Sequence, residues 1–306
     1  MMDNGRVIVG VDIGGTNIRV GTVDSNINLK DEKIFSSRQL QGEKAVENLV
    51  ESLKSYIDSL QLPVEAVSIG FPSTINKNRD VLINTPNLSG FTGVQIKKIC
   101  EDALKTSIFI NRDAAMLLYY DLYKLGIKND SVIVGVYIGT GIGNSIIVDG
   151  VEITGHDGVA CELGHIPVPG RDMLCSCGLK GCIELYAGGK GLERICAEAF
   201  PETAIGDIFV KHCNTPQIEQ FISDVADVIV IEITILNPGC VVLGGGVLQM
   251  EAFPKELLRQ TILKKTRRPV PGDAVKILFS ESETQFSGVI GAALYAMNQL
   301  EKARKE

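Results

Sequence analysis

Two segments of this chain follow the same plan: Val11-Asp-Ile-Gly-Gly-Thr-Asn-Ile-Arg-Val-Gly-Thr-Val-Asp24 and Val136-Tyr-Ile-Gly-Thr-Gly-Ile-Gly-Asn-Ser-Ile-Ile-Val-Asp149. Each is an apolar run, a Gly/Thr turn and a second apolar run that ends in Asp, which is the pattern of a β-hairpin. A repeat of such long period predicts two related domains that each open with the same hairpin. The alternative is that two unrelated hairpins resemble one another by chance.

The rest of the chain alternates short Val- and Ile-rich runs with amphipathic stretches. The runs predict strands at Arg6–Ile13, Asn17–Asp24, Ala66–Phe71, Ser107–Asp113, Ser131–Gly139, Asn144–Asp149, Cys240–Leu243 and Val275–Ser280. The amphipathic stretches predict helices over 43–60, 218–236 and 289–302. This alternation is typical of the α/β class, and 306 residues leave room for two domains. The expected division is 1–113 plus 289–306 for the N-terminal domain and 114–288 for the C-terminal domain.

Composition narrows the function classes. The formal net charge is −7 and the two signs are interspersed, whereas a nucleic-acid binder would need clustered Lys and Arg. The most apolar stretch, 225–236, contains Asp227 and Glu232 and falls short of the roughly 20 residues that a bilayer requires. No targeting signal is visible, so we expect a cytoplasmic protein that binds neither nucleic acid nor membrane. Its eight cysteines then favour metal binding over disulfides.

The glycine turns predict a nucleotide site. Glycine lets the backbone N–H groups approach phosphate oxygens, and the threonine hydroxyls add donors. Asp12 would repel a bare phosphate, but it suits a Mg²⁺ ion held between them. A third cluster after a strand fits a flat surface for adenosine, because Gln249 breaks the dinucleotide pattern and no Walker sequence is present. The predicted ATP and Mg²⁺ residues are Asp12, Gly14, Gly15, Thr16, Gly139, Thr140, Gly141, Gly143, Gly244, Gly245 and Gly246.

A metal site is predicted from His165-x₉-Cys175-x-Cys177-x₄-Cys182. One His and three Cys form a closed tetrahedral set for Zn²⁺, which indicates a structural site without an open position for water. Free buried thiols are the alternative. Two carboxylates, Glu162 and Glu184, flank the metal-binding segment, and a zinc-fixed pair of this kind suits the hydroxyls of a sugar.

Three motifs together resemble the ROK family (repressors, open reading frames and kinases): Asp12-Ile-Gly-Gly-Thr16, Glu162-Leu-Gly-His165 and Cys175-Ser-Cys-Gly-Leu-Lys-Gly-Cys-Ile-Glu184. The resemblance implies a two-domain actin-like ATPase (ribonuclease H-like) fold with a zinc-binding loop in the second domain. It also implies a cleft where sugar and MgATP meet, and a homodimer. The family's catalytic aspartate falls on Asp113, and a carboxylate at the end of a strand agrees with a general base for a sugar hydroxyl. A helix N-cap is the other role open to Asp113.

One position departs from the common pattern of the family. Many of its kinases have Asn-Asp where this chain has Asn111-Arg112-Asp113. With Gly70-Phe-Pro-Ser73 and Thr85-Pro-Asn-Leu88, this sequence looks more like the family's D-allose kinases. The expected function is phosphorylation of a hexose, foremost D-allose, at its 6-hydroxyl, and the expected sugar contacts are Asn87, Arg112, Asp113, Glu162, His165 and Glu184.

Alternatives to the allose kinase remain open. Within the family, a glucokinase or an N-acetylmannosamine kinase would use the same motifs. From another class, a non-catalytic sugar-sensing regulator would share the fold, but no basic recognition helix is visible in this sequence.

Overall fold

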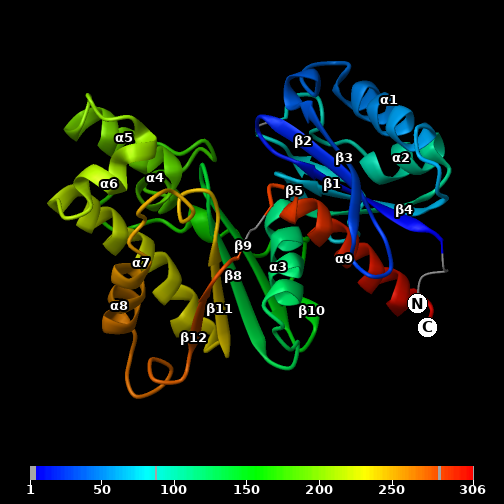
Figure 1. The fold of residues 1–306 in the computed structure, drawn as a ribbon. Helices are drawn as coiled ribbons and strands as arrows, with labels where there is room; N and C mark the ends of the chain where they lie inside the picture. The colour runs from blue at the N-terminus through cyan, green and yellow to red at the C-terminus, as the bar shows by residue number, and fades with distance from the viewer. Residues whose placement is uncertain (1–4, 87, 282–283, 306) are drawn as a thin grey trace. The chain divides into compact units, whose positions relative to one another are not determined.

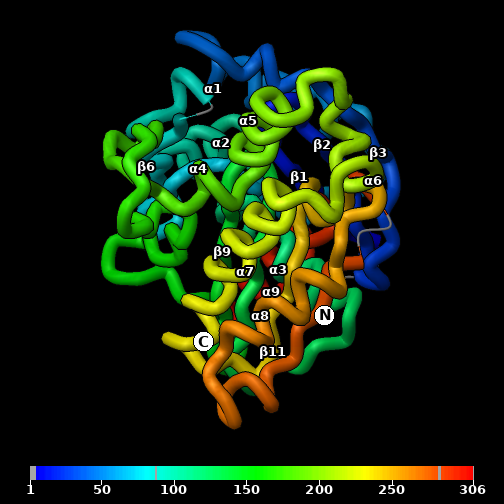
Figure 2. Tube along the Cα trace, turned by 90° about the vertical axis from the view of Figure 1, so that its left-hand side faces the viewer, coloured from blue at the N-terminus to red at the C-terminus, as the bar shows by residue number. Residues whose placement is uncertain are grey.

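The structure is a computed structural model, and it describes residues 5–86, 88–281 and 284–305. The chain divides into two compact units. Unit 1 comprises Met1–Ile127, Thr154–Ala160 and Glu281–Glu306, and unit 2 comprises Lys128–Ile153 and Cys161–Ser280. The boundaries expected after Asp113 and Gly288 differ from these, because they fall at the beginning of two helices that both lie in unit 1, α3 (Asp113–Lys124) and α9 (Ser287–Ala303). Figures 1 and 2 show these helices side by side.

Unit 1 is built on a five-stranded mixed sheet in the order β3-β2-β1-β4-β7. β1 (Val7–Ile13) pairs antiparallel with β2 (Asn17–Val23), which pairs antiparallel with β3 (Leu29–Ser36). On its other side β1 pairs parallel with β4 (Val64–Phe71), and β4 pairs parallel with β7 (Ser107–Arg112). The carboxyl ends of β1, β4 and β7 therefore lie at one edge of this sheet.

Alternation along β1 explains how helices cover both faces of this sheet (Figure 1). Val9 and Val11 belong to one core cluster with residues of α1 (Ala45–Asp58) and α2 (Ile96–Leu104). The intervening Ile8 packs instead with α9. Gly10 lies on that second face, and a Cβ there would stand only 2.1 Å from the backbone oxygen of Val289. The absence of a side chain at Gly10 thus lets α9 approach the sheet backbone closely.

Unit 2 repeats the topology of unit 1. Its sheet has the order β10-β9-β8-β11-β12, formed by Val151–Glu152, Ile142–Val148, Val132–Ile138, Cys240–Gly244 and Lys276–Phe279. β8, β9 and β10 pair antiparallel, and β8, β11 and β12 pair parallel. The hairpin β8–β9 thus has the place in unit 2 that β1–β2 has in unit 1. The predicted α/β class and the predicted repeat of the hairpin are confirmed.

The core of unit 2 forms between its sheet and α7 (Pro216–Leu236), whose Val225, Ile229 and Ile233 are fully buried. Asn237 ends this helix in the left-handed conformation. The other helices of unit 2 are α4 (Glu184–Ala187), α5 (Gly189–Ala199), α6 (Ile208–His212) and α8 (Lys255–Lys265). The short elements of the chain are β5 (Thr74–Ile75), β6 (Leu82–Asn84), η1 (Ser37–Gln39), η2 (Leu163–His165) and η3 (Ile205–Asp207).

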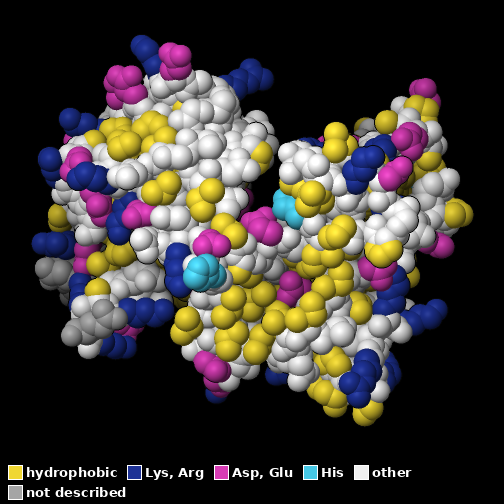
Figure 3. Space-filling view, turned by 180° about the vertical axis from the view of Figure 1, so that it is seen from behind, with side chains coloured by type: hydrophobic (Ala, Val, Ile, Leu, Met, Phe, Trp, Pro, Cys, Tyr) yellow, Lys and Arg dark blue, Asp and Glu magenta, His cyan; other side chains and the backbone are white. Residues whose placement is uncertain are grey.

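None of the helices in the described part of the chain combines the length and the apolar character of a membrane span. On the face drawn in Figure 3, basic and acidic side chains are interspersed, as the sequence led us to expect.

Candidate functional site

In unit 1, the first glycine turn joins β1 to β2 and is held by hydrogen bonds on both sides. The N–H of Gly14 donates to the carbonyl of Asn17 at 2.9 Å. Ser37 donates from its hydroxyl to the carbonyl of Gly15 at 2.8 Å, and from its N–H to the carbonyl of Thr16 at 3.0 Å. Gly15 and Thr16 are exposed, so a ligand can reach the fixed turn. Ser37 was missed from the sequence, because it lies 22 residues away in a polar stretch without a motif.

Two carboxylates lie at the carboxyl edge of the same sheet, Asp12 near the end of β1 and Asp113 directly after β7. Burial and the nearby charge of Asp113 raise the pKa of Asp12 to about 6, although Arg19 lies 3.8 Å from its carboxylate. A hard divalent cation would relieve this repulsion and accept oxygen ligands, so the pair fits a bound Mg²⁺.

Asp113 is the first residue of α3, and its Oδ1 accepts a hydrogen bond from the N–H of Ala114 at 2.7 Å. Its carboxylate thus contacts the helix N-terminus. The neighbouring Arg112 is only 7% exposed and donates to the carbonyl of Ala160 at 2.9 Å. Asn111 is fully buried. The predicted sugar contact Asn87 lies outside the described residues.

In unit 2, the second glycine turn joins β8 to β9 and is fixed by the start of α5. The N–H of Gly139 donates to the carbonyl of Gly141 at 3.0 Å. The N–H groups of Gly189 and Lys190 donate to the carbonyls of Gly139 and Thr140 at 2.7 and 3.0 Å. The Gly188-Gly189 pair was the sequence signal for this contact, and it was missed. Gly143 lies beyond the turn, within β9 and opposite Tyr137.

The third glycine cluster lies beside the second turn. Gly244 ends β11, and the N–H of Val247 donates to the carbonyl of Ile138, the last residue of β8, at 3.0 Å. Gly245 has a φ of +96°, and a Cβ there would stand 2.4 Å from the same carbonyl oxygen. The structure therefore brings two of the predicted ATP-binding segments together. After Gly246 the chain forms turns until α8 begins at Lys255.

The predicted zinc ligands form one cluster. The ligand atoms of His165, Cys175, Cys177 and Cys182 all lie within 4.8 Å of one another. Cys175 Sγ is 3.6 Å from His165 Nδ1, and Cys177 Sγ is 3.5 Å from Cys182 Sγ. Ligands about 2.0–2.3 Å from one tetrahedral Zn²⁺ stand roughly 3.4–3.8 Å apart, so the cluster fits this ion. The N–H of Leu179 lowers the pKa of Cys177, whereas burial raises the pKa of Cys175 and of Cys182.

The two predicted sugar carboxylates of unit 2 lie on either side of the His165 ring. His165 Nε2 is 3.8 Å from an oxygen of Glu162, and His165 Nδ1 is 3.8 Å from an oxygen of Glu184. Glu184 also accepts from the Cys175 thiol at 3.5 Å. A Cβ on Gly141 would stand 2.4 Å from the second oxygen of Glu184. The metal cluster, both carboxylates and the second glycine turn thus converge within unit 2.

Comparisons with known proteins agree with this arrangement. The sequence model of the ROK family matches residues 8–299. The N-acetyl-D-glucosamine kinase of Pectobacterium carotovorum subsp. carotovorum is 26% identical over 93% of this chain and 97% of its own length. The crystal structure of the ROK hexokinase from Thermus thermophilus has a TM-score of 0.77 and 26% identity, and the match covers 97% of this chain and 99% of that one.

A second solved structure carries ligands. The ROK family glucokinase from Streptomyces griseus, in complex with glucose and AMPPNP, has a TM-score of 0.75 and 25% identity over 95% of this chain and 99% of that one. With the His/Cys₃ cluster in unit 2, these likenesses confirm the predicted two-domain actin-like fold.

Proposed function

The chain belongs to the ROK family and is an ATP-dependent sugar kinase, and we propose that it phosphorylates a hexose, foremost D-allose, at the 6-hydroxyl with Asp113 as general base. The observation that carries this proposal is the pair Asp12 and Asp113 at the carboxyl edge of the sheet in unit 1, close enough that the charge of Asp113 raises the pKa of Asp12. One carboxylate serves the cation of the nucleotide, and the other serves the sugar.

The remaining residues divide between the two substrates. The turns Gly14–Thr16 and Gly139–Gly141 bind the phosphates of ATP, and Gly244–Gly246 accommodates the adenosine. The sugar hydroxyls donate hydrogen bonds to the carboxylates of Glu162 and Glu184 and accept one from the ring N–H of His165. Asn87 and Arg112 also contact the sugar. Gly143 supports the second turn from within β9.

In the reaction, Asp113 takes the proton of the 6-hydroxyl while that oxygen attacks the γ-phosphorus of ATP, and the bond to the β-phosphate oxygen breaks to release ADP. Phosphoryl transfer has a loose transition state, so a well-placed ordinary carboxylate suffices as base. Backbone N–H groups of the turns stabilise the charge on the phosphate oxygens. Mg²⁺, held by Asp12, would neutralise phosphate charge.

D-Allose is proposed as substrate from the sequence Asn111-Arg112-Asp113, which sets this chain apart from the common Asn-Asp pattern. Glucose and N-acetylglucosamine are the alternatives, since relatives are described as kinases of these sugars. The homodimer remains a prediction from the family.

A coupled ADP-release assay tests the proposal. D-Allose, D-glucose, D-mannose, D-fructose, N-acetylmannosamine and N-acetylglucosamine are compared by kcat/KM with Mg·ATP. Asp113→Asn should lower kcat by about 10²–10⁴-fold and keep sugar binding in calorimetry. Asp102→Asn, at a side chain 67% exposed on α2, is the matched control. An active Asp113→Asn enzyme would remove the assignment of the base. A preference for another hexose would remove D-allose and keep the kinase, and silence across the panel would favour a sugar sensor.

A further inference from the structure

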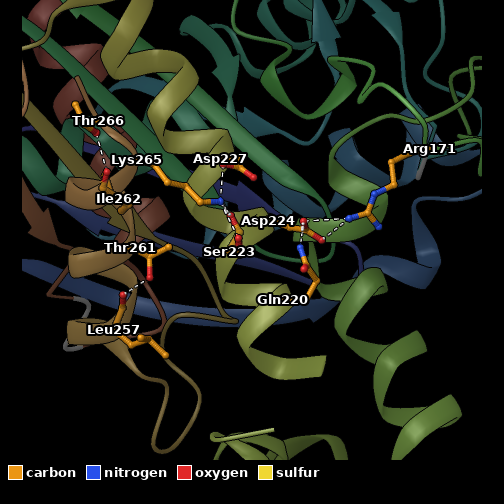
Figure 4. Close-up of polar contacts among 10 residues, drawn as sticks. All are labelled: Arg171, Gln220, Ser223, Asp224, Asp227, Leu257, Thr261, Ile262, Lys265 and Thr266. Carbon is orange, nitrogen blue, oxygen red and sulfur yellow. Dashed lines mark hydrogen bonds and ion pairs between the residues drawn. The ribbon is translucent and has the colours of Figure 1, made fainter. Parts of the chain in front are cut away.

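Residues 171–182, called the zinc loop below, carry three of the predicted zinc ligands, and Arg171 binds this loop to helix α7. Arg171 donates from Nη2 to both carboxylate oxygens of Asp224, at 3.2 and 3.3 Å. Figure 4 shows this pair beside Gln220, which donates to the same carboxylate at 2.8 Å. Asp224 is 14% exposed in its side chain, and burial raises its pKa, so the guanidinium compensates a carboxylate that has lost most of its water.

The same guanidinium also covers an aromatic ring on α4. Arg171 Cζ lies 4.4 Å from the centroid of the Tyr186 ring, and Arg194 Cζ lies 5.5 Å from it. The hydroxyl of Tyr186 accepts a hydrogen bond from the N–H of Met173 at 3.2 Å. Tyr186 is 6% exposed and follows Glu184 by two residues, on the same short helix. The ring is thus held by two cations and by the zinc loop itself.

The backbone of Arg171 lies beside the residue that precedes one of the metal ligands. Gly181 precedes the ligand Cys182, and a Cβ on Gly181 would stand 2.5 Å from the carbonyl oxygen of Arg171. The N–H of Val168 donates to the carbonyl of Gly181 at 2.8 Å, which closes the loop over the same spot. A displacement of Arg171 would therefore be felt at Cys182 on one side and, through Tyr186, at Glu184 on the other.

We propose that Arg171 and Asp224 are positioning residues that hold the zinc loop on α7 and thereby keep both the metal ligands and Glu184 in place. Arg171 touches neither substrate in this proposal and acts only through its neighbours. The part that concerns Glu184 rests on the proposed function, whereas the part that concerns the metal does not. A helix of four residues such as α4 has little stability of its own, so its orientation depends on tertiary contacts, among them that of Arg171 with Tyr186.

Helix α7 supplies a matched control. Lys265 of α8 binds Asp227, three residues after Asp224, at 2.7 Å, and also contacts the hydroxyl and the carbonyl of Ser223 at 2.7 and 3.0 Å (Figure 4). This second ion pair joins the same helix to α8 instead of to the segment that carries the zinc ligands. If the substitutions only loosened α7 in general, variants of both ion pairs would release zinc faster. If Arg171 and Asp224 position the zinc loop, only variants of that pair would do so.

The test measures zinc release and kinetics in Arg171→Met, Asp224→Asn, Asp227→Asn and Lys265→Met. The zinc-loaded proteins are mixed with the chromogenic chelator 4-(2-pyridylazo)resorcinol, and the release rate is followed by absorbance. Substitutions behind metal ligands cost about 10–100-fold in metal affinity, so we expect release to accelerate at least tenfold in the first two variants and to stay at the wild-type rate in the others. The KM for the sugar should rise about tenfold in the same two variants while the KM for ATP stays unchanged. Arg171→Lys keeps the positive charge but loses the planar group that stacks on Tyr186, so its zinc release rate should lie between those of the wild-type protein and Arg171→Met.

Wild-type zinc release in Arg171→Met would overturn the proposal, and so would an acceleration in Asp227→Asn equal to that in Asp224→Asn. If zinc release accelerates as expected but the wild-type protein phosphorylates no sugar, the positioning of the zinc loop stands and the proposed function fails.

Discussion

The contact between Gly141 and Glu184 gives a prediction whose size can be derived from the structure. A Cβ on Gly141 would stand 2.4 Å from a carboxylate oxygen of Glu184, where ordinary contact begins at 3.4 Å. Gly141→Ala must therefore displace this carboxylate by about 1 Å. Movement of the Glu184 carboxylate away from Gly141 is hindered, because its other oxygen already lies 3.5 Å from Cys175 Sγ and 3.8 Å from His165 Nδ1. A misplacement of about 1 Å can cost about 10²-fold in rate, or about 2.7 kcal/mol.

We expect Gly141→Ala to lower kcat/KM for the sugar by about 10²-fold while the protein keeps its fold. Gly139→Ala is the matched control in the same turn, because a Cβ there meets no atom within 4 Å. Its effect should fall on the KM for ATP, since the added methyl group stands where phosphates would approach. Steady-state kinetics with each substrate varied at saturation of the other separate the two effects.

A double-mutant cycle identifies the path of the effect. In a Glu184→Ala background, Gly141→Ala has no carboxylate to displace, so it should cost almost nothing further. An undiminished loss in that background, or an unchanged sugar kcat/KM in Gly141→Ala itself, would refute the role of Glu184 as the displaced group.

Two further predictions concern stability and the metal. Glu232 on α7 is 8% exposed, and burial raises its pKa to about 7 from an ordinary 4.5. The folded state therefore binds this proton more tightly than the unfolded state does. As a result, stability falls as the pH rises from about 4.5 to 7. The free energy of unfolding should fall by at most about 3 kcal/mol over this range. Glu232→Gln should not show this loss. Urea unfolding of both proteins at pH 5 and pH 8 tests this, and the reasoning is contradicted if the difference in unfolding free energy between the two proteins does not change with pH. Cys177→Ser should reduce bound zinc well below one ion per chain and raise the KM for the sugar more than that for ATP, whereas Cys213→Ser, outside the cluster, should change neither in elemental analysis and kinetics.

The parts of the fold that the sequence predicted are those in which local pattern and burial coincide. β1, β2, β8 and β9 are apolar runs on both sides of a glycine turn, and the structure has each within two residues of the expected bounds. β3 was missed, because Leu29–Ser36 is a largely exposed edge strand whose Lys30-Asp-Glu-Lys33 charges hide the alternation. The short helices α4 and α6 were missed for another reason, since four and five residues carry no period.

The candidate site divides in the same way. The zinc ligands were predictable because three of them lie within eight residues and metal geometry fixes their chemistry. Arg171 and Asp224 are 53 residues apart, on a loop and on a helix, and no spacing rule joins an arginine to an aspartate over such a distance. Ion pairs of this kind are set by tertiary packing, which a single sequence does not encode locally.

In the proposed site, His165 belongs both to the predicted metal cluster and to the predicted sugar contacts. Its Nδ1 is the ring nitrogen nearest to Cys175, at 3.6 Å, and its Nε2 is the one that faces Glu162, at 3.8 Å. A Zn²⁺ bound at Nδ1 would leave the proton on Nε2, where it could be donated to Glu162 or to a hydroxyl of the sugar. Without the metal, either nitrogen can carry the proton, and Nδ1–H would turn toward Glu184 instead. If His165 binds the sugar as proposed, a bound Zn²⁺ would favour the tautomer with its proton on Nε2, and removal of the metal should weaken sugar binding more than ATP binding.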